Sequence, residues 1–435
     1  MEGSRQLFPI LPLLEDLESR FVRGSRPLEK VGMVCLQHLL STTGSLFEKF
    51  IKLGLRPQDT FVLGKVYSAN PDVTKRLRSL SFQTFESRTP RSWGSYETEL
   101  LVEVESMWDR AVTHFRKSSV RQVVVLDDGG CVLASVPVGR LDFPVTGVEQ
   151  TMSGLAFQDA GRVHVPVVQV AASAAKKLIE PNLIQDAIFN RLSAHKAYLE
   201  GSICGVVGLG NIGRAVLETL LKHHPFVFVF DIVDSALLED LPSGAVACKS
   251  LKELLEKSNC VFGCTGRDLF EGNNWWQGLS GKRTLLSCSS HDTEFKSILT
   301  TLNNVGFTSK DKLADTTVST HRGELLLVRG GFPVNFDGSL ESVPAQDIQL
   351  TRALLMGGVL QAAERNTQLD EGYQPVILRP DLQIFIVNDW LRLVPFRKKD
   401  YAPEVINIFE KSSTITDQSA GGDQAAPETP ERSWR

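Results

Sequence analysis

The chain of 435 residues has room for two or three domains of ordinary size. Its composition, 42% apolar and 23% charged, is that of a globular protein with a large core, which excludes wholesale disorder. The formal net charge of −4 predicts no strong attraction to nucleic acid or to an anionic membrane.

The N-terminal segment carries Glu15, Asp16 and Glu18 beside a short apolar run, which is unlike a signal peptide. No stretch approaches the ~18 uninterrupted apolar residues of a membrane helix. The seven cysteines are sparse and form no CxxC pair, so reduced thiols are favoured over disulfides or a structural metal site. These features predict a soluble, cytoplasmic protein without a metal ion.

The first part of the chain alternates strand-like and helical patterns. Strands are expected at residues 31–36, 60–66 and 122–126, with a helix at 97–115 before the third strand. The third strand is a continuous β-branched run that leads into Asp127-Asp128-Gly129-Gly130. Ligands of open α/β sheets bind at the carboxyl ends of strands, so this turn is a candidate site.

The same alternation continues to about residue 345. It predicts a strand at 163–170, a helix at 181–199, a strand–turn–helix unit at 203–221, strands at 227–232, 260–264, 284–288 and 324–328, and a helix at 345–364. Residues 411–435 are polar and rich in Ser, Thr, Asp, Gln, Gly and Pro, which predicts a disordered tail.

The strongest motif is the glycine-rich turn of the unit at 203–221. Gly208, Gly210 and Gly213 have GxGxxG spacing, with Asn211 and Ile212 opening the following helix. The first glycine permits a tight turn, the second lets a pyrophosphate approach the backbone, and the third lets helix and strand pack closely.

An acidic residue follows at the distance that a dinucleotide site requires. Asp231 ends the next strand, 23 residues after Gly208. A carboxylate there accepts hydrogen bonds from ribose hydroxyls and repels a 2′-phosphate, which favours NAD over NADP. The alternative is a glycine turn that serves packing alone.

Several motifs occur in the order found in one known family. They are DDGG after a strand, Glu149 to Gly154, Pro166 to Lys176, the glycine turn, Cys264-Thr265-Gly266 and Pro333-Val334-Asn335. In this series the chain resembles the S-adenosylhomocysteine hydrolases (adenosylhomocysteinases) over most of its length. The resemblance implies a substrate domain, a central NAD domain and a helix that returns to the first domain. It also implies that bound NAD⁺ transiently oxidises a ribose hydroxyl.

The resemblance implies catalytic roles for four residues. Asp128 matches the family's catalytic aspartate, and Lys176 matches the lysine that stabilises a developing alkoxide. Glu180 stands for an aspartate, and His38 is the candidate for the histidine of the substrate domain. Alternatively, Asp128 caps a turn and Lys176 is a solvated surface lysine.

Further residues match positions that line the cofactor. Asn335 matches an asparagine that contacts the nicotinamide, and Thr151 and Ser153 match hydroxyl residues near the ribose. Thr265 matches a threonine beside the cofactor.

The departures from the family pattern weaken the catalytic match. They are Gln150 for a glutamate, Pro181 for an asparagine, and Ser290 and Ser342 for two histidines. Glutamine transfers no proton, so acid–base capacity is lost at that position. Asn182 is a possible substitute at the second position. His291, next to Ser290, is either a substitute for its neighbour or a surface histidine. The polar tail also lacks the family's C-terminal lysine and tyrosine, which in the family reach into a neighbouring subunit. The resemblance therefore leaves open whether this chain forms a homo-oligomer.

Taken together, motifs and resemblance predict an α/β protein of two Rossmann-like doubly wound domains that binds NAD and a small-molecule substrate. The expected divisions are a substrate domain at 1–190, a dinucleotide domain at 191–345, a helical return at 346–405 and the tail. Three functions are open: a diverged enzyme that oxidises a secondary hydroxyl of a nucleoside-like or other polar substrate, a true adenosylhomocysteinase, or a catalytically silent NAD-binding protein.

Overall fold

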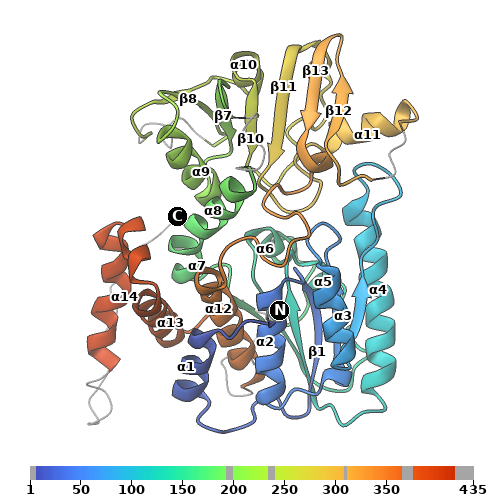
Figure 1. Ribbon diagram of the computed structural model, residues 1–435. Helices are drawn as coiled ribbons and strands as arrows, with labels where there is room; N and C mark the ends of the chain where they lie inside the picture. The colour runs from blue at the N-terminus through green and yellow to red at the C-terminus, as the bar shows by residue number, and fades with distance from the viewer. Residues whose placement is uncertain (1–5, 193–198, 234–240, 308–310, 365–375, 417–435) are drawn as a thin grey trace, which may run out of the picture.

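Two seven-stranded sheets organise the chain. The computed structural model describes residues 6–192, 199–233, 241–307, 311–364 and 376–416. Figure 1 shows the two sheets in separate halves of the molecule, the first sheet below the second. Helices connect the parallel strands of each sheet, so both halves are doubly wound α/β structures.

The first sheet is parallel throughout and has the order β14-β6-β5-β4-β1-β2-β3. Its strands are β1 (Val31–Gln37), β2 (Thr60–Gly64), β3 (Gln83–Glu86), β4 (Gln122–Asp127), β5 (Val145–Glu149), β6 (Val167–Gln169) and β14 (Val376–Ile377). Every residue of β1, β2 and β4 is buried, as expected for central parallel strands covered on both faces. Since these strands are parallel, their carboxyl ends meet at one edge.

The second sheet has the order β12-β13-β11-β10-β7-β8-β9, in which only the edge strand β12 is antiparallel. Its strands are β7 (Cys204–Val207), β8 (Val227–Phe230), β9 (Ala245–Ala247), β10 (Cys260–Gly263), β11 (Ser280–Ser287), β12 (Thr316–Ser319) and β13 (Arg322–Leu327). The central order of both sheets is that of a dinucleotide-binding Rossmann sheet.

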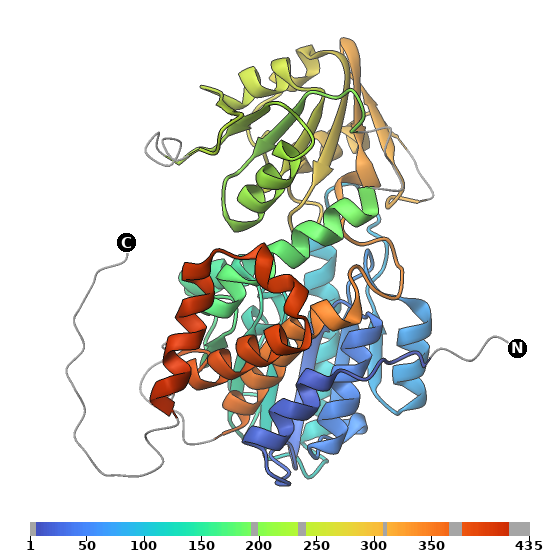
Figure 2. The same cartoon turned by 60° about the vertical axis from the view of Figure 1, so that its left-hand side comes forward.

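Helices cover both sheets and join the halves. They are α1 (Pro12–Phe21), α2 (Ser41–Lys52), α3 (Pro71–Ser79), α4 (Tyr96–Phe115), α5 (Cys131–Ala134), α6 (Met152–Asp159), α7 (Ala174–Leu178), α8 (Glu180–Leu192), α9 (Asn211–Leu221), α10 (Leu251–Lys257), α11 (Lys296–Asn304), α12 (Ala345–Ala363), α13 (Pro380–Leu393) and α14 (Pro403–Thr416). Short 3₁₀ turns lie at Pro57–Asp59, Trp275–Gly278, Val328–Gly331 and Pro395–Asp400. Figure 2 shows α8 between the halves, where it contacts α9 of the second half and α12 of the first.

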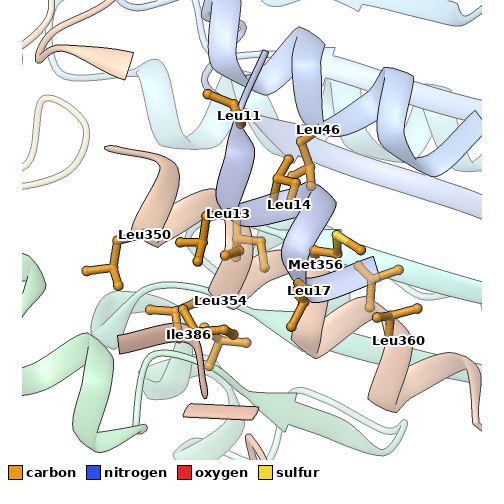
Figure 3. Packing of buried hydrophobic residues seen from close by; sticks show 14 of the residues in the cluster. Leu11, Leu13, Leu14, Leu17, Leu46, Leu350, Leu354, Met356, Leu360 and Ile386 are labelled. Atoms are coloured by element: carbon orange, nitrogen blue, oxygen red, sulfur yellow. The ribbon is translucent and has the colours of Figure 1, made fainter. Parts of the chain in front are cut away.

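Helix α12 returns the chain to the first sheet and is buried along almost its whole length. Its apolar residues pack against the leucines of α1, as Figure 3 shows for Leu13, Leu17 and Leu354. On the sheet side, a Cβ at Gly358 would lie 2.7 Å from Cγ2 of Val170. The glycine therefore permits close approach of the helix to the sheet.

The fold class expected from the sequence is confirmed: two Rossmann-like doubly wound halves with a returning helix. The expected boundary at residue 190 falls within α8, and that at 345 coincides with the first residue of α12. Strand β6 begins at Val167 rather than at 163, since Pro166 has no N–H to donate to a ladder.

The C-terminal region also differs from expectation. Helix α14 continues to Thr416, so residues 411–416 are helical rather than the start of a tail. Ile406 and Phe409 are buried and anchor its first turns, and adding polar residues to an existing helix costs little. The rest of the expected tail, 417–435, and residues 193–198 of the expected helix at 181–199 lie outside the described residues.

Candidate functional site

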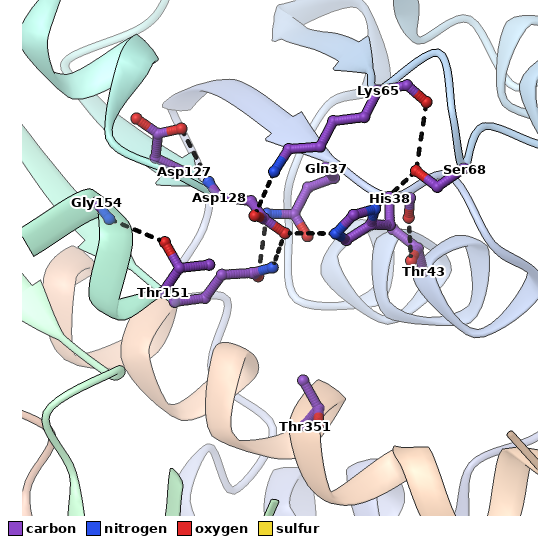
Figure 4. A network of polar contacts seen from close by, with 12 residues as sticks. Gln37, His38, Thr43, Lys65, Ser68, Asp127, Asp128, Thr151, Gly154 and Thr351 are labelled. Atoms are coloured by element: carbon purple, nitrogen blue, oxygen red, sulfur yellow. Dashed lines mark hydrogen bonds and ion pairs between the residues drawn. The ribbon is translucent and has the colours of Figure 1, made fainter. Parts of the chain in front are cut away.

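The carboxyl edge of the first sheet carries a cluster of charged side chains (Figure 4). Lys65 follows β2, and its Nζ lies 2.5 Å from Oδ1 of Asp128, which follows β4. His38 follows β1, and its Nε2 lies 3.1 Å from Oδ2 of Asp128. The structure thus brings two residues singled out from the sequence, Asp128 and His38, together around a lysine that was not.

Burial and charge fix the protonation of this cluster. Burial alone would raise the pKa of Asp128, but Lys65 and His38 hold it well below its ordinary value. Burial lowers the pKa of His38 despite the nearby carboxylate, so its imidazole is neutral at pH 7. Its Nε2–H then donates to Asp128, and its Nδ1 accepts from the Ser68 hydroxyl at 2.6 Å. Asp128 is therefore a fixed anion and a poor proton acceptor.

Gln150 adds a donor to the cluster where the family pattern has a carboxylate. Its side-chain amide donates to Oδ2 of Asp128, and Nε2 of Gln37 donates to its carbonyl at 3.2 Å. The amide therefore supports the charge of Asp128 through a hydrogen-bond chain that starts on β1.

Two further carboxyls, those of Asp127 and Glu149, shape the turn behind the cluster. Burial raises the pKa of Asp127 to about 7, and its oxygens accept the N–H groups of Asp128 and Leu133 at 2.8 Å. Burial and the charge of Asp127 raise the pKa of Glu149 well above its ordinary value. A Cβ at Gly154 would lie 2.2 Å from the Glu149 carboxyl carbon, so this position requires glycine.

Aromatic rings from both halves pack around His38. The ring of Phe336 stacks on His38 with 4.1 Å between centroids. Tyr67 packs against Phe336 and against Phe332, at centroid distances of 5.9 and 5.5 Å. The Lys65–Asp128 ion pair itself is buried, with side chains 0% and 2% exposed, which strengthens its electrostatics.

His291 packs against Tyr67, one of these rings, and is buried. It is therefore not a surface histidine. Its ring packs edge-on against Tyr96 at 5.5 Å between centroids. Burial, followed by the charge of Lys65, lowers its pKa to about 3, so it is neutral at pH 7. Its buried Nε2 has no partner among the residues that the structure describes.

Lys176 and Glu180 form an ion pair across the junction of α7 and α8. Glu180 also accepts a hydrogen bond from the Thr351 hydroxyl of α12, at 2.6 Å. The lysine side chain is only 13% exposed, so it is not a freely solvated surface group. Pro181 occupies the first turn of α8, where a missing N–H is tolerated, and Asn182 donates to the Asp400 carbonyl instead of facing the cluster.

The glycine turn of the second half fits a dinucleotide pyrophosphate. Gly208 has φ +89°, which strains any other residue. A Cβ at Gly213 would lie 1.8 Å from the carbonyl oxygen of Gly208, whereas a Cβ at Gly210 would meet no atom within 4 Å. Gly210 thus leaves open space above the N-terminus of α9, which begins with Asn211 and Ile212.

Asp231 lies beside this turn at the end of β8. One carboxylate oxygen accepts the Leu209 N–H at 2.6 Å, and the other accepts the Val233 N–H at 2.9 Å. Each oxygen retains a lone pair, so the carboxylate fits ribose hydroxyls while it braces the turn.

Thr265 lies against the turn, because a Cβ at Gly208 would be 2.9 Å from its Cγ2. Thr265 donates both its N–H and its hydroxyl to Oε1 of Glu294, at 2.9 and 2.8 Å. Glu294 is fully buried, and its other oxygen accepts the Gly266 N–H at 2.9 Å. Asn335 is buried after the bridge between Ser287 and Pro333. The Thr265 loop is therefore held by a carboxylate that the sequence did not reveal.

Thr151 and Ser153 lie on the first half at the start of α6. The Thr151 hydroxyl donates to Oε1 of Glu149 at 2.7 Å and accepts the Gly154 N–H at 3.1 Å. Ser153 is exposed and donates to the Thr151 hydroxyl at 3.2 Å. The threonine hydroxyl is thus committed to capping α6.

No group of three or more His, Cys, Asp or Glu side chains in the described part of the chain is arranged to hold a metal ion. Among the described helices, none is long and apolar enough to span a bilayer.

Two Rossmann-type halves, one with a glycine turn and one with a charged cluster, define the structural class of this chain. It is similar to two uncharacterized proteins of Mycobacterium tuberculosis, Rv0104 of strain H37Rv and MT0113 of strain CDC 1551. Each is 30% identical over 342 residues, which is 78% of this chain and 65% of the relative. No known family profile matches the chain.

Three solved structures that align with much of this chain are a synthase, a dehydrogenase and a reductase. The A chain of dipicolinate synthase from Bacillus subtilis aligns with TM-score 0.38 and 11% identity, over 79% of this chain and 100% of that chain. A putative D-3-phosphoglycerate dehydrogenase from Ralstonia solanacearum gives TM-score 0.40 and 11% identity, over 79% and 98%. An NADPH-dependent glyoxylate/hydroxypyruvate reductase from Sinorhizobium meliloti gives 0.38 and 14%, over 74% and 92%.

Proposed function

We propose that this chain binds NAD at the glycine turn and uses it to oxidise a secondary hydroxyl of a small polar substrate, as a diverged relative of the adenosylhomocysteinases. The proposal rests on the contact between the second half, which carries the glycine turn, and the Asp128 turn of the first half. His291, from the half with the glycine turn, lies against the Asp128 turn of the other half: a Cβ at Gly129 would be 3.5 Å from its ring. A substrate between these halves is thus within reach of both.

When bound, NAD⁺ supplies the two-electron oxidant, and the side chains on both edges position the substrate. The Lys176 ammonium stabilises the negative charge that develops on a hydroxyl oxygen during oxidation. Lys65 and Asp128 form a fixed ion pair at the carboxyl edge of the first sheet. The neutral His291 offers an imidazole nitrogen that no described residue occupies.

A true adenosylhomocysteinase is less well supported. Gln150 binds Asp128 as a donor and has no acid–base capacity, and Asn182 is turned to Asp400. Ser290 and Ser342 supply no imidazole. A second candidate, a silent NAD-binding protein, is favoured by one observation: Lys65, His38 and Gln150 all bind Asp128, so that carboxylate is satisfied without a ligand.

The test begins with cofactor binding by calorimetry. Gly210→Ala meets no protein atom within 4 Å, so it should leave the fold unchanged and weaken NAD binding by at least about tenfold, which is ~1.4 kcal/mol. Gly278→Ala is the matched control, because its Cβ is also free and it lies away from the turn. Equal NAD affinity in both variants and the wild type refutes this cofactor site.

The second stage follows absorbance near 340 nm of the NAD-loaded protein after addition of adenosine, S-adenosylhomocysteine and simple hydroxy acids. A rise that Lys176→Ala abolishes supports oxidation, provided that this variant still binds NAD. NAD binding without a rise for any compound favours the silent protein.

A further inference from the structure

One buried arginine of the returning helix is left without a counterion. Arg352 on α12 is only 4% exposed, and its Nε donates to the Thr42 hydroxyl at 3.0 Å. Neither terminal nitrogen donates a hydrogen bond, and no carboxylate lies within 4.0 Å, among the residues that the structure describes. A guanidinium has five N–H donors, and the terminal nitrogens of Arg352 are not among the fully enclosed unpartnered atoms of the described residues, so their N–H groups stay open to a ligand.

The carboxylates nearest to Arg352 are engaged elsewhere. Three of them act on its pKa through their charge alone: Glu341, Glu180 and Asp128. Asp128 is paired with Lys65, and Glu180 with Lys176. Both carboxylates already form an ion pair with a lysine, so neither of them is the counterion of Arg352.

Glu341 also has other partners, because it accepts hydrogen bonds at the N-terminus of α2. Its Oε1 accepts the Ser41 hydroxyl at 2.9 Å and the N–H of Thr42. The helix N-terminus stabilises this charge. Its Oε2 is buried and has no partner in the described structure, so the carboxylate is only half satisfied and does not reach Arg352.

We propose that Arg352 is a binding residue for an oxyanion of the substrate, a carboxylate or a phosphate. This inference rests on the proposed function for the identity of the ligand as substrate, and it narrows the substrate to a hydroxyl compound that carries such a group. The two terminal nitrogens of a guanidinium match two oxyanion oxygens in a bidentate pair. The bound group supplies the missing counterion.

The location of Arg352 suits an anchor for the reacting hydroxyl. The charges of Asp128 and Glu180 reach it from both ion pairs of the site, and its own charge lowers the pKa of His38. The neighbouring Thr351 donates to Glu180 of the Lys176 pair, and Thr42, which binds Arg352, precedes Thr43, whose hydroxyl donates to the His38 carbonyl. The Glu341 carboxylate opposes the ligand by repulsion, so its neutralisation should tighten binding.

The experiment measures binding of two probes, inorganic phosphate and acetate, to the full chain without NAD, by isothermal titration calorimetry. We expect one probe to bind the wild type, and Arg352→Gln to weaken that binding at least tenfold. Glu341→Gln should tighten it several-fold, and this variant decides the matter if Arg352→Gln does not fold. Arg379→Gln is the control, because Arg379 is already paired with Glu364 and Asp381.

The probe that binds identifies the source of the oxyanion as carboxylate or phosphate. Binding of neither probe to the wild type, or equal affinity in the wild type, Arg352→Gln and Glu341→Gln, overturns the proposal. Since NAD is absent from these titrations, failure of the cofactor site leaves this result interpretable. Conversely, loss of oxyanion binding leaves the NAD titration of the Gly210 variant untouched.

Discussion

Replacing Lys65 by methionine tests the central ion pair. Lys65 and Asp128 are buried side chains, 0% and 2% exposed, with 2.5 Å between Nζ and Oδ1. Removing one member of such a pair leaves an uncompensated buried charge, which costs about 3–5 kcal/mol. Lys65→Met should therefore lower the free energy of unfolding by this amount at pH 7.5, as measured by urea denaturation followed by tryptophan fluorescence.

The stability difference between the wild type and Lys65→Met should depend on pH, and the pKa of Asp128 gives the direction of that dependence. In the wild type the pKa of Asp128 is depressed in the folded state, so its ionisation stabilises the fold above the unfolded value of about 3.9. That stability is lost as the pH falls through the folded pKa. Without Lys65, burial dominates and raises the folded pKa, so the penalty in the variant is relieved as the pH falls. The difference between wild type and variant should thus shrink from pH 7.5 to pH 4.5.

The control is Lys52→Met. The Lys52 side chain is 62% exposed and lies 3.6 Å from Glu15, so its loss should change the stability by less than about 1 kcal/mol. A double variant, Lys65→Met with Asp128→Asn, should recover much of the lost stability, because no charge remains buried. A loss below about 1 kcal/mol in Lys65→Met, or a gap that does not narrow at low pH, refutes the reasoning about this pair.

Two further predictions concern the packing of α12. Gly358→Ala should lower the free energy of unfolding by about 1–3 kcal/mol, because its Cβ would lie 2.7 Å from Val170; an unchanged Tm in thermal unfolding contradicts this. Arg397→Met should cost about 3 kcal/mol in urea denaturation, since Arg397 binds Asp347 at 2.7 Å and that carboxylate is only 3% exposed. The control is Lys398→Met, whose side chain is 56% exposed in its ion pair with Glu410, so this change should cost less than about 1 kcal/mol. Equal losses of stability in the two variants would contradict the importance of burial for the Arg397–Asp347 pair.

The periodic parts of the fold were predictable because they are determined locally. The β-branched run of β4 indicates a strand, and the glycine turn before α9 indicates the start of a helix, each within a few consecutive residues. Strands β3, β5, β9, β12 and β14 were not predicted. Of these, β12 is an antiparallel edge, and β14 has two residues, Val376 and Ile377, that pair with β6. Such pairing is a property of the tertiary fold.

The cluster around Asp128 was only half predictable for a similar reason. The rule that ligands gather at the carboxyl ends of parallel strands selected Asp128 after β4, and the same rule applied to β2 selects Lys65. Arg352 carries no such signal, because it lies in a long apolar helix whose return to the first sheet brings it to the site. Residues that are distant in sequence become partners only through the packing of that helix.

The structure gives a physical reason for a glutamine rather than a glutamate at position 150. A glutamate at position 150 would set a second carboxylate against Asp128, and like charges at hydrogen-bond distance raise the pKa of one of them. Gln150 instead donates to Asp128 and is itself held by Gln37. Lys65 and His38 keep Asp128 ionised, and the Gln150 amide adds a hydrogen bond to the same carboxylate without competing for a proton. The cluster around Asp128 therefore holds a permanent charge distribution in place of a group poised to transfer a proton.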